Sequence, residues 1–455
     1  MSDMLSIGAS GVRAYQTALA TVGENIANVS TVGYARRAVT LNEVAGGSGS
    51  INGYGAGNGV YITGVNRSSD IYSAAALRAT TSDLTRTTNG AEWLDRIQSA
   101  LTGNQLTSRV TSFFGSAQAL AAEPDSTALR TGMLSAASST ALAFKATGKA
   151  FDQVDADLQR SGLQAAQSLT SLGNSLTKIN EGISRSQPGS TAVAQLMDQR
   201  DTILSQMSEM VDIDVKMDTI GRATVKLGGV EGPAFVQGSM TGTVSYAHNE
   251  DGTAAFAVTL RGEVTAITPN GGTLGGIVDG TQRVNAIRQS LDTVAGDFVK
   301  AVNDNQAAGV DREQVAGAPM FVVPVNGRKT DIEIPATFEG KMIAAATAAV
   351  GTTPAGGVRD SSNLAALEKT RVSQGFEASL TTLVTSNATA YKQKNTIAEA
   401  QAAIRDGAVT ALSVAAGVNL DSEAVDLIRF QQAYAASSRV IQIARETMQT
   451  ILDIR

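Results

Sequence analysis

The fold of this chain is decided by its last stretch, Asn419 to Arg455, which reads NLDSEAVDLIRFQQAYAASSRVIQIARETMQTILDIR. Every third or fourth residue along it is apolar, aromatic or small, and no charge falls on this stripe. A spacing of about 3.5 residues keeps such a stripe against a partner helix over many turns. The stripe consists of Leu427, Phe430, Tyr434, Ser437, Ile441, Ala444, Met448 and Ile451. The stretch therefore predicts a long helix that needs a partner.

The other end of the chain repeats this spacing and supplies a candidate partner. Residues 4–28 read as a helix whose stripe consists of Leu5, Gly8, Val12, Tyr15, Leu19, Val22 and Ile26. Two such seams predict that the terminal helices pair, in either the parallel or the antiparallel sense. The alternative is two ordinary amphipathic helices on a globular core, because bundle helices show similar spacing over short lengths.

Composition narrows the class of protein. The 455 residues suffice for several domains, and 36 basic against 42 acidic residues give a net charge of −6, which argues against a nucleic-acid binder. The absence of cysteine excludes disulfides and thiolate metal sites. No apolar run approaches the roughly eighteen residues of a membrane span, and residues 1–5 lack the features of a secretory signal. A cytoplasmic location is the default unless a specialised export route exists.

The order of patterns along the chain predicts a mainly α fold with β insertions. Helical spacing changes to strand alternation near Asp212, and a break at 123–126 separates two helical stretches. We expect an N-terminal assembly helix (1–44), a glycine-rich loop (45–66), an elongated helical bundle (67–212), a small outer β-rich insertion (213–272), a helix followed by β or loop structure (273–358), returning helices (359–416) and a C-terminal assembly helix (417–455). The chain leaves a helical stem, builds outward and comes back.

No pattern in the sequence predicts catalytic, cofactor-binding or metal-binding residues. The carboxylates that invite such roles are Asp152, Asp155 and Asp157, which we assign to a solvated helix face, and Asp212 and Asp214, which lack the loop spacing of a calcium site. The single histidine, His248, is expected in an exposed hairpin, and Trp93 in the core. One histidine and no cysteine leave little room for a nucleophile with a paired base.

A short motif follows the first helix. Residues 27–34 read Ala-Asn-Val-Ser-Thr-Val-Gly-Tyr, and they match every defined position of the A-N-x-x-T-x-G-Y signature of bacterial flagellar axial proteins, the rod, hook and hook-associated subunits. In physical terms Asn28 is able to cap the helix end and Gly33 allows a turn, while Tyr34 anchors it by packing. The chain thus resembles this family at its N-terminal end.

The C-terminal end resembles one branch of that family. Residues 417–424, followed by the Ile-Arg-Phe-Gln-Gln run at 428–432 and Ser-x-Arg-Val-Ile at 437–441, are similar to hook-associated junction proteins. Residues 317–321 and 360–364 also resemble stretches of that branch, whereas similarity is sparse across 213–350. The hook subunit or another axial rod or hook protein is the alternative within the family, but hook proteins place mostly β structure where residues 67–212 read as helix.

The resemblance implies a non-enzymatic subunit of a ring at the hook–filament junction. Its expected partners are further copies of itself, hook subunits, a second hook-associated protein and an export chaperone on the C-terminal helix, with no nucleic acid, membrane or cofactor. Export through the flagellar type III apparatus needs no cleaved signal and places the protein outside the cell. The implied assembly residues are Leu5, Val12, Tyr15, Leu19, Val22, Ile26, Asn28, Thr31, Gly33, Tyr34, Leu420, Leu427, Phe430, Tyr434, Ile441, Met448 and Ile451.

Two further expectations depend on the seams. A surface hydrolase with coiled-coil ends is the alternative from a different class, and it differs in not requiring the terminal seams for its activity. Free terminal helices would expose their apolar seams, so we expect both ends to be disordered in the monomer and to order on polymerisation.

Overall fold

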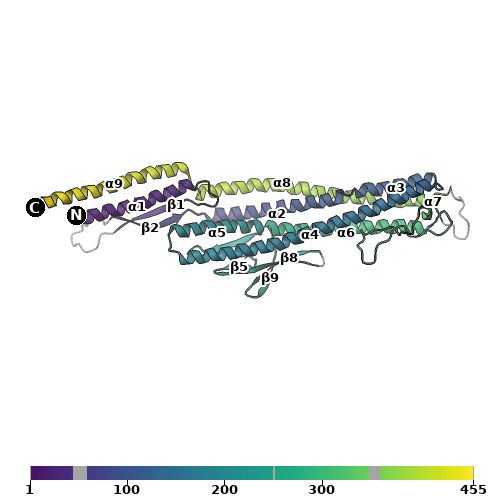
Figure 1. Ribbon diagram of the computed structural model, residues 1–455, viewed down its shortest axis with the longest axis horizontal. Helices are drawn as coiled ribbons and strands as arrows, with labels where there is room; N and C mark the ends of the chain where they lie inside the picture. The colour runs from purple at the N-terminus through teal and green to yellow at the C-terminus, as the bar shows by residue number, and fades with distance from the viewer. Residues whose placement is uncertain (1, 45–58, 250–251, 348–358, 454–455) are drawn as a thin grey trace.

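The long helices set the shape of the molecule. In this computed structural model, which describes residues 2–44, 59–249, 252–347 and 359–453, the chain is elongated, with both termini at the same end (Figure 1). Nine α-helices are described: α1 (Ser2–Ala27), α2 (Ile71–Thr102), α3 (Leu106–Ala122), α4 (Thr127–Arg185), α5 (Thr191–Met210), α6 (Gly272–Ala307), α7 (Ser362–Gln374), α8 (Phe376–Ala416) and α9 (Leu420–Asp453). The predicted mainly α fold with paired terminal helices is confirmed.

Capping side chains explain where the bundle helices begin. The Asp70 carboxylate accepts hydrogen bonds from the backbone N–H groups of residues 72 and 73 at the start of α2. The Ser126 hydroxyl accepts from Leu129 N at 3.4 Å, so the break predicted at 123–126 starts α4. A second break follows α4, and the Ser190 hydroxyl caps α5 by accepting from Val193 N at 3.3 Å. Each cap satisfies a donor that the first helical turn leaves unpaired.

The bundle is held together by an aromatic core at the end far from the termini. The Phe298 ring of α6 lies at 5.4 to 6.1 Å between centroids from five other phenylalanine rings. These rings are Phe113 and Phe114 of α3, Phe144 of α4, Phe321 of the following loop and Phe376 of α8. Edge-to-face and offset contacts of this kind add to the apolar area that they bury. Through Phe376 they fasten the returning helix α8 to α3 and α6.

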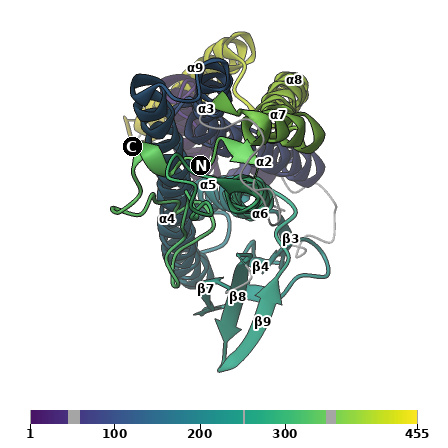
Figure 2. The ribbon, with the colours of Figure 1, turned by 90° about the vertical axis from the view of Figure 1, so that its right-hand side faces the viewer.

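In the part of the chain that the structure describes, the strands form four small antiparallel sheets. The two in the outer region have the orders β3-β4-β5-β6 and β7-β8-β9, and in Figure 2 the strands β7 to β9 project away from the helices. Their strands are β3 (Ile213–Met217), β4 (Ala223–Leu227), β5 (Ala234–Gln237), β6 (Met240–Thr241), β7 (Thr243–His248), β8 (Ala254–Leu260) and β9 (Glu263–Ile267). The predicted outer β-rich insertion is present within 213–272.

The remaining strands lie at the two ends of the bundle. The hairpin β1 (Arg37–Glu43) and β2 (Val60–Arg67) packs on α1, and β10 (Gly309–Val310) pairs with β11 (Ala346–Thr347) near the short helix η1 (Gly340–Met342). The expected glycine-rich loop falls largely on residues 45–58, which lie outside the described residues, and β2 occupies its last part. The division of the chain into seven segments stays a prediction.

The outer sheet docks on α4 through two aromatic side chains. The Tyr246 ring packs on Gly162, where an added Cβ atom would lie 2.5 Å from it, so only glycine leaves the space. His248 was expected to be exposed, but its side chain is 23% exposed and its Nε2 lies 3.7 Å from the Asp155 carboxylate. That expectation was wrong because β7 turns this side chain toward α4.

The three carboxylates assigned to a solvated face of α4 have partners on other elements. Asp152 pairs with Arg288 of α6 and, at 3.3 Å, with Arg328. Asp157 pairs with Arg96 of α2 at 3.0 Å. The assignment to a purely solvated face was therefore wrong. Helical spacing shows that residues share a face, but it does not show which neighbouring element that face meets.

The docking of the outer sheet should weaken at high pH. Burial, with the nearby Asp155 charge, raises the pKa of Tyr246 from 10.0 to about 12. A raised folded-state pKa contributes stability that is complete below pH 10.0 and is lost as the pH rises through about 12. Because burial also raises the pKa of Tyr34, spectrophotometric titration should show a late tyrosinate phase whose amplitude Tyr246→Phe lowers by one tyrosine. The control Tyr72→Phe, at an 81% exposed site, should keep the full late amplitude, and an unchanged late amplitude in Tyr246→Phe would contradict this account.

Candidate functional site

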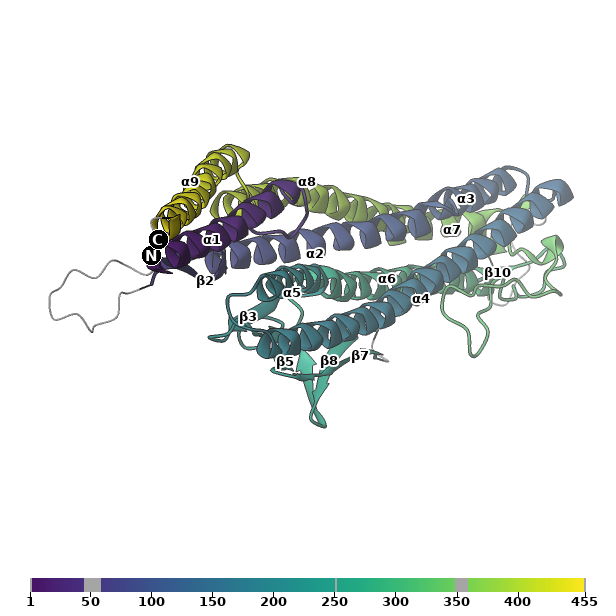
Figure 3. The ribbon, with the colours of Figure 1, turned by 60° about the vertical axis from the view of Figure 1, so that its left-hand side comes forward.

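The terminal helices α1 and α9 pair in the antiparallel sense. Figure 3 shows them side by side beyond the end of the bundle. The rings of Tyr15 and Phe430 lie 6.3 Å apart between centroids. Added Cβ atoms at Gly8 and Gly11 would lie 2.6 Å from Ile441 Cγ1 and from Ser437 Oγ, respectively, so these glycines allow the helices to approach closely. Rising numbers on α1 meet falling numbers on α9, which resolves the open question of direction.

The buried stripe of α1 is displaced from the predicted seam and shares only Gly8 and Val22 with it. Small and polar side chains are buried on this helix, whereas several apolar ones of the seam are half-buried. The buried residues are Gly8, Gly11, Ala14, Ala18, Thr21, Val22 and Asn25, and the half-buried ones are Leu5, Val12, Tyr15, Leu19 and Ile26. On α9 the predicted Leu427, Phe430, Tyr434 and Ile441 are half-buried. The expectation that the single chain leaves these ends disordered differs from the structure, in which they pair.

Both ends of α9 leave apolar side chains uncovered. The predicted seam residues Met448 and Ile451 are 49% and 55% exposed, and Leu420, an expected assembly residue that begins the helix, is 50% exposed. A second set of exposed apolar side chains on the same helix consists of Val425, Ile428, Ile443 and Leu452. Contiguous exposed apolar surface on a helix indicates an interaction site. Pairing with α1 alone therefore does not bury the apolar surface of α9.

The motif residues build a tight turn between α1 and β1. The Asn28 amide donates to Glu24 O at 2.9 Å, and its side-chain oxygen accepts from the Thr31 hydroxyl at 3.2 Å. Gly33 has φ +83°, and an added Cβ would lie 2.6 Å from Thr202 Oγ1 of α5. The predicted roles of Asn28 and Gly33 within the turn agree with these contacts. Gly33 additionally lets the turn approach the bundle.

Asn25, one helical turn before the motif, is the centre of the polar contacts. It is fully buried, and its side chain uses its whole hydrogen-bonding capacity. The amide nitrogen donates to Arg37 O at 2.8 Å and to Glu423 Oε2 at 2.9 Å. The amide oxygen accepts from Arg37 N at 3.0 Å and from the Tyr34 hydroxyl at 2.8 Å. Tyr34 thus anchors the turn by a hydrogen bond as well as by packing.

On one side of Asn25 these contacts reach α9. The Glu423 side chain is fully buried in the first turn of α9, and it accepts from Arg36 Nε at 2.6 Å. Arg36 also pairs with Asp426 at 3.2 Å. The Asn419 side chain caps this turn by accepting from the backbone N–H groups of residues 421 and 422. A buried carboxylate is stable only when it is paired and hydrogen-bonded, and both conditions hold here.

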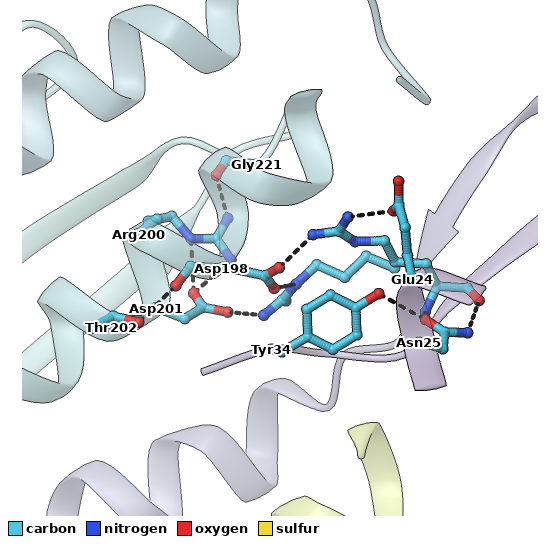
Figure 4. Close-up of polar contacts among 10 residues, drawn as sticks. Glu24, Asn25, Tyr34, Asp198, Arg200, Asp201, Thr202 and Gly221 are labelled. Atoms are coloured by element: carbon cyan, nitrogen blue, oxygen red, sulfur yellow. Dashed lines mark hydrogen bonds and ion pairs between the residues drawn. The ribbon is translucent and has the colours of Figure 1, made fainter. Parts of the chain in front are cut away.

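On the other side the contacts reach α5 of the bundle. Arg37 NH2 donates to Asp198 at 2.8 Å, and Arg67 of β2 bridges Asp198 at 2.7 Å and Asp201 at 2.9 Å. Figure 4 shows Asp198 and Asp201 of α5 facing the side that carries Glu24, Asn25 and Tyr34. Arg200 pairs with Asp201 at 2.7 Å and donates to Gly221 O. The arginines therefore fix the terminal elements to α5.

Backbone contacts reinforce this arrangement. Val65 N of β2 donates to Gly189 O in the turn between α4 and α5 at 2.7 Å, and Arg36 N donates to Ala416 O at the end of α8 at 2.9 Å. We call α1, the turn 28–34, β1, β2 and α9 the terminal module. We call its polar contacts with α5 and within itself the joint, which consists of Asn25, Tyr34, Arg36, Arg37, Arg67, Asp198, Asp201 and Glu423.

Burial changes the electrostatics of the joint. It raises the pKa of the Tyr34 phenol, although the Arg37 guanidinium, 4.7 Å from the ring centre, opposes part of that rise. Burial also lowers the pKa of Arg78 on α2, beside Asp201 and Arg200. The Tyr34 hydroxyl therefore remains a hydrogen-bond donor to Asn25 throughout the physiological range.

Sequence reasoning found Tyr34 but missed the other residues of the joint. Asn25 and Glu423 lie on the helices that were predicted to pair, but their roles depend on partners up to 398 residues away. Polar residues at buried positions of an apolar stripe were the available signal: Asn25 follows Val22 by three residues. Asp198 and Asp201 carried no signal, because acidic residues three apart are common on solvated helix faces.

Two observations on the described residues bear on metal binding and catalysis. No group of three or more histidine, aspartate or glutamate side chains within 2–44, 59–249, 252–347 and 359–453 is placed to hold a metal ion. A groove of about 370 Å³ between α2, α6 and α8 has Trp93, Arg283 and Lys394 among its lining residues. Its carboxylate is Asp279, whose pKa burial would raise but hydrogen bonds from Arg86 and Lys394 lower. A membrane-crossing helix is not found in the described part of the chain.

Paired terminal helices on an elongated bundle, with the motif turn between them, define an axial subunit of the flagellar type. Family models agree at both ends: residues 5–34 match "Flagella basal body rod protein", and residues 415–454 match "Flagellar basal body rod FlgEFG protein C-terminal". Residues 91–321, a little over half of the chain, match "Flagellar hook-associated protein FlgK helical domain". The chain belongs to the flagellar hook-associated protein FlgK family.

Several relatives carry the name flagellar hook-associated protein 1. The chain is 26% identical to that of Escherichia coli K12 over 337 residues and 28% identical to that of Salmonella typhimurium over 338, covering 71% of this chain and 60% of each relative. With that of Bacillus subtilis it is 23% identical over 97% of this chain and 96% of the relative. The solved structure of the flagellar hook junction protein FlgK from Burkholderia pseudomallei has a TM-score of 0.64 at 14% identity, over 74% of this chain and 99% of that one. It confirms the fold.

Replacing Asn25 should destabilise the terminal module far more than replacing the motif residue Asn28. Asn25→Ala leaves buried groups of Glu423, Arg37 and Tyr34 without partners and should cost about 2–4 kcal/mol. Asn28→Ala, at a half-buried turn, should cost less than about 1 kcal/mol. Native-state hydrogen exchange of α1 and β1 amides measures both opening free energies. Equal costs for the two variants would contradict the central place of Asn25.

Proposed function

We propose that this chain is a structural subunit of the bacterial flagellum that forms the hook–filament junction. The observation that carries the proposal is the α1–α9 pair, which stays partly uncovered: Leu420, Met448 and Ile451 are about half exposed on a helix whose other side is already paired. The hook-associated relatives and the hook junction protein of Burkholderia pseudomallei support it. The match covers 60% of the length of the Escherichia coli and Salmonella typhimurium relatives, so the activity of those whole proteins is a proposal for this chain.

The proposed assembly surface has two parts. One part consists of Leu420 and the apolar residues of the two seams, namely Leu5, Val12, Tyr15, Leu19, Val22, Ile26, Leu427, Phe430, Tyr434, Ile441, Met448 and Ile451. Of these residues Val22 is buried, and the others are half-buried or exposed. The other consists of the motif turn with Asn28, Thr31, Gly33 and Tyr34, of which Thr31 and Gly33 are exposed. Apolar surface that one chain leaves uncovered is buried when neighbouring copies pack along the helices.

The proposed partners follow from this place in the flagellum. They are further copies of the chain in a ring, hook subunits on one side, and a second hook-associated protein on the other. An export chaperone covers α9 before assembly, and export takes place through the flagellar type III apparatus to the outside of the cell. The uncovered apolar stripe of α9 supports the chaperone, since such a helix needs protection in the cytoplasm.

A structural role also fits the chemistry better than the hydrolase alternative. In the groove beside Trp93, Asp279 is the sole carboxylate among the lining residues, and Arg86 and Lys394 already bind it. General acid–base chemistry requires a titratable group that is available to the substrate. We therefore propose that the chain is not an enzyme.

A strain that lacks this protein tests its place in the flagellum. Loss of a junction protein should leave hooks without filaments, whereas loss of a hook subunit should leave no hooks, and electron microscopy distinguishes the two. The complete chain should restore filaments and swimming, but a chain without Asn419–Arg455 should not, although its bundle should still fold. Filament growth with the truncated chain would contradict the proposal.

A single charge on the proposed assembly surface should block polymerisation without unfolding the chain. Ile451→Asp places a carboxylate on a 55% exposed site of α9, where it costs the monomer little but would be buried between copies. The matched control is Val264→Asp, at a 66% exposed site of the outer strand β9. The amount of sedimenting polymer that purified chains form, and the number of filaments on cells, should fall for Ile451→Asp but not for Val264→Asp. A similar loss for Val264→Asp, or none for either variant, would argue against this surface.

A further inference from the structure

Two consecutive arginines connect the joint to opposite partners. Arg36 directly precedes β1, and Arg37 begins it, so the backbone is extended and successive side chains point to opposite sides. Arg36 Nε donates to Glu423 of α9 at 2.6 Å. Arg37 NH2 donates to Asp198 of α5 at 2.8 Å. One short segment of backbone therefore faces the C-terminal helix on one side and the bundle on the other.

Asn25 holds this segment in place and is itself held by α9. Its side chain binds both the N–H and the C=O of Arg37, which fixes the backbone at the start of β1. Its second amide proton goes to Glu423 Oε2 at 2.9 Å. When α9 is absent from its place, one donor of Asn25 and the Arg36 guanidinium lose their acceptor. The position from which Arg37 reaches Asp198 thus depends on a carboxylate of α9.

The burial of Glu423 makes this dependence strong. Its side chain is fully buried, and hydrogen bonds from Asn25 and Arg36 compensate the cost of removing its charge from water. If the segment 34–37 shifts, Glu423 is left buried and underpaired, which costs more than the loss of an exposed ion pair. Each side of the joint therefore penalises movement of the other.

We infer that seating of α9 on α1 and docking of the terminal module on α5 are one coupled equilibrium, with Glu423 as the connecting group. A chain whose α9 is withdrawn, or covered by another protein, has an open joint between the terminal module and the bundle. This inference concerns the single chain and holds whether or not the chain polymerises. If the proposed function is correct, the coupling keeps the terminal module undocked until α9 is released.

The amide of Val65 reports directly on the docked state. It donates to Gly189 O between α4 and α5 at 2.7 Å and lies far along the chain from α9. Glu423→Ala should accelerate its hydrogen exchange by about 5- to 100-fold, the range expected when buried polar groups lose a partner. Glu423→Gln, which keeps an acceptor for Asn25, should give a smaller factor. Amides around Phe298 in the bundle core should not change, which separates this effect from global unfolding.

The matched control removes a different carboxylate from the same helix. Glu446→Ala lies at an exposed position of α9, away from the joint, and should leave exchange at Val65 unchanged. If Glu423→Ala accelerates exchange within α9 but not at Val65, the two events are independent and the inference is wrong. An equal effect of Glu446→Ala would also overturn it, because any loosening of α9 would then suffice.

A double-mutant cycle with Asp198 completes the test. Glu423 and Asp198 lie on different helices and share no hydrogen-bonding partner, so independent effects on Val65 exchange should multiply. Coupling predicts that Glu423→Ala adds almost nothing once Asp198→Ala has opened the joint. It also predicts the reciprocal effect, in which Asp198→Ala accelerates exchange of the backbone amides in the first turns of α9. Multiplying factors, or unaffected α9 amides, would refute the coupling.

Discussion

The buried Glu423 carboxylate is the contact on which the arrangement of the two chain ends depends. It sits in the first turn of α9 and is bound by Asn25 of α1 and by Arg36. A charge without water is tolerated only in a complete set of partners, and these two partners come from α1 and from the residue before β1, far along the chain from α9. The apolar contacts of α1 with α9 tolerate some sliding, whereas this polar set has one satisfied geometry. It therefore determines the register of the terminal helices.

The two ends of the molecule are held together by different physical means. At the end far from the termini, phenylalanine rings around Phe298 bury apolar area, which favours any close packing of the helices. At the joint, near the termini, the arginine–carboxylate contacts through Asp198 and Asp201 are directional and partly buried. Small residues such as Gly8 and Gly11 let the terminal helices approach closely, and they leave larger apolar side chains at the sides. These uncovered apolar side chains fit the proposed packing of neighbouring copies along α1 and α9.

Sequence patterns were reliable where one period repeats over many turns. The break predicted at 123–126 is where α4 begins, and the two terminal seams predicted the pairing of α1 with α9. Patterns were less reliable for faces. Five of the seven residues in the predicted stripe of α1 are only half-buried, because the close approach of α9 at Gly8 and Gly11 buries a neighbouring line of small residues instead. A hydrophobic repeat identifies the apolar face of a helix. It does not identify the small residues at which a neighbouring helix can approach most closely.

The sequence by itself determined the class of protein: long helices, an outer β-rich insertion, a helical seam at each end of the chain, and a motif after the first helix. It determined these because helical period, turn residues and a short signature are local properties of the chain. Only the tertiary structure decided that Asn25, and not Asn28, is the central polar residue of the terminal module, and that Asp198 and Asp201 receive the arginines of the hairpin. The contribution of a buried polar side chain to stability depends on the partner that replaces its lost water. For Asn25 one such partner is Glu423, which lies 398 residues away along the chain.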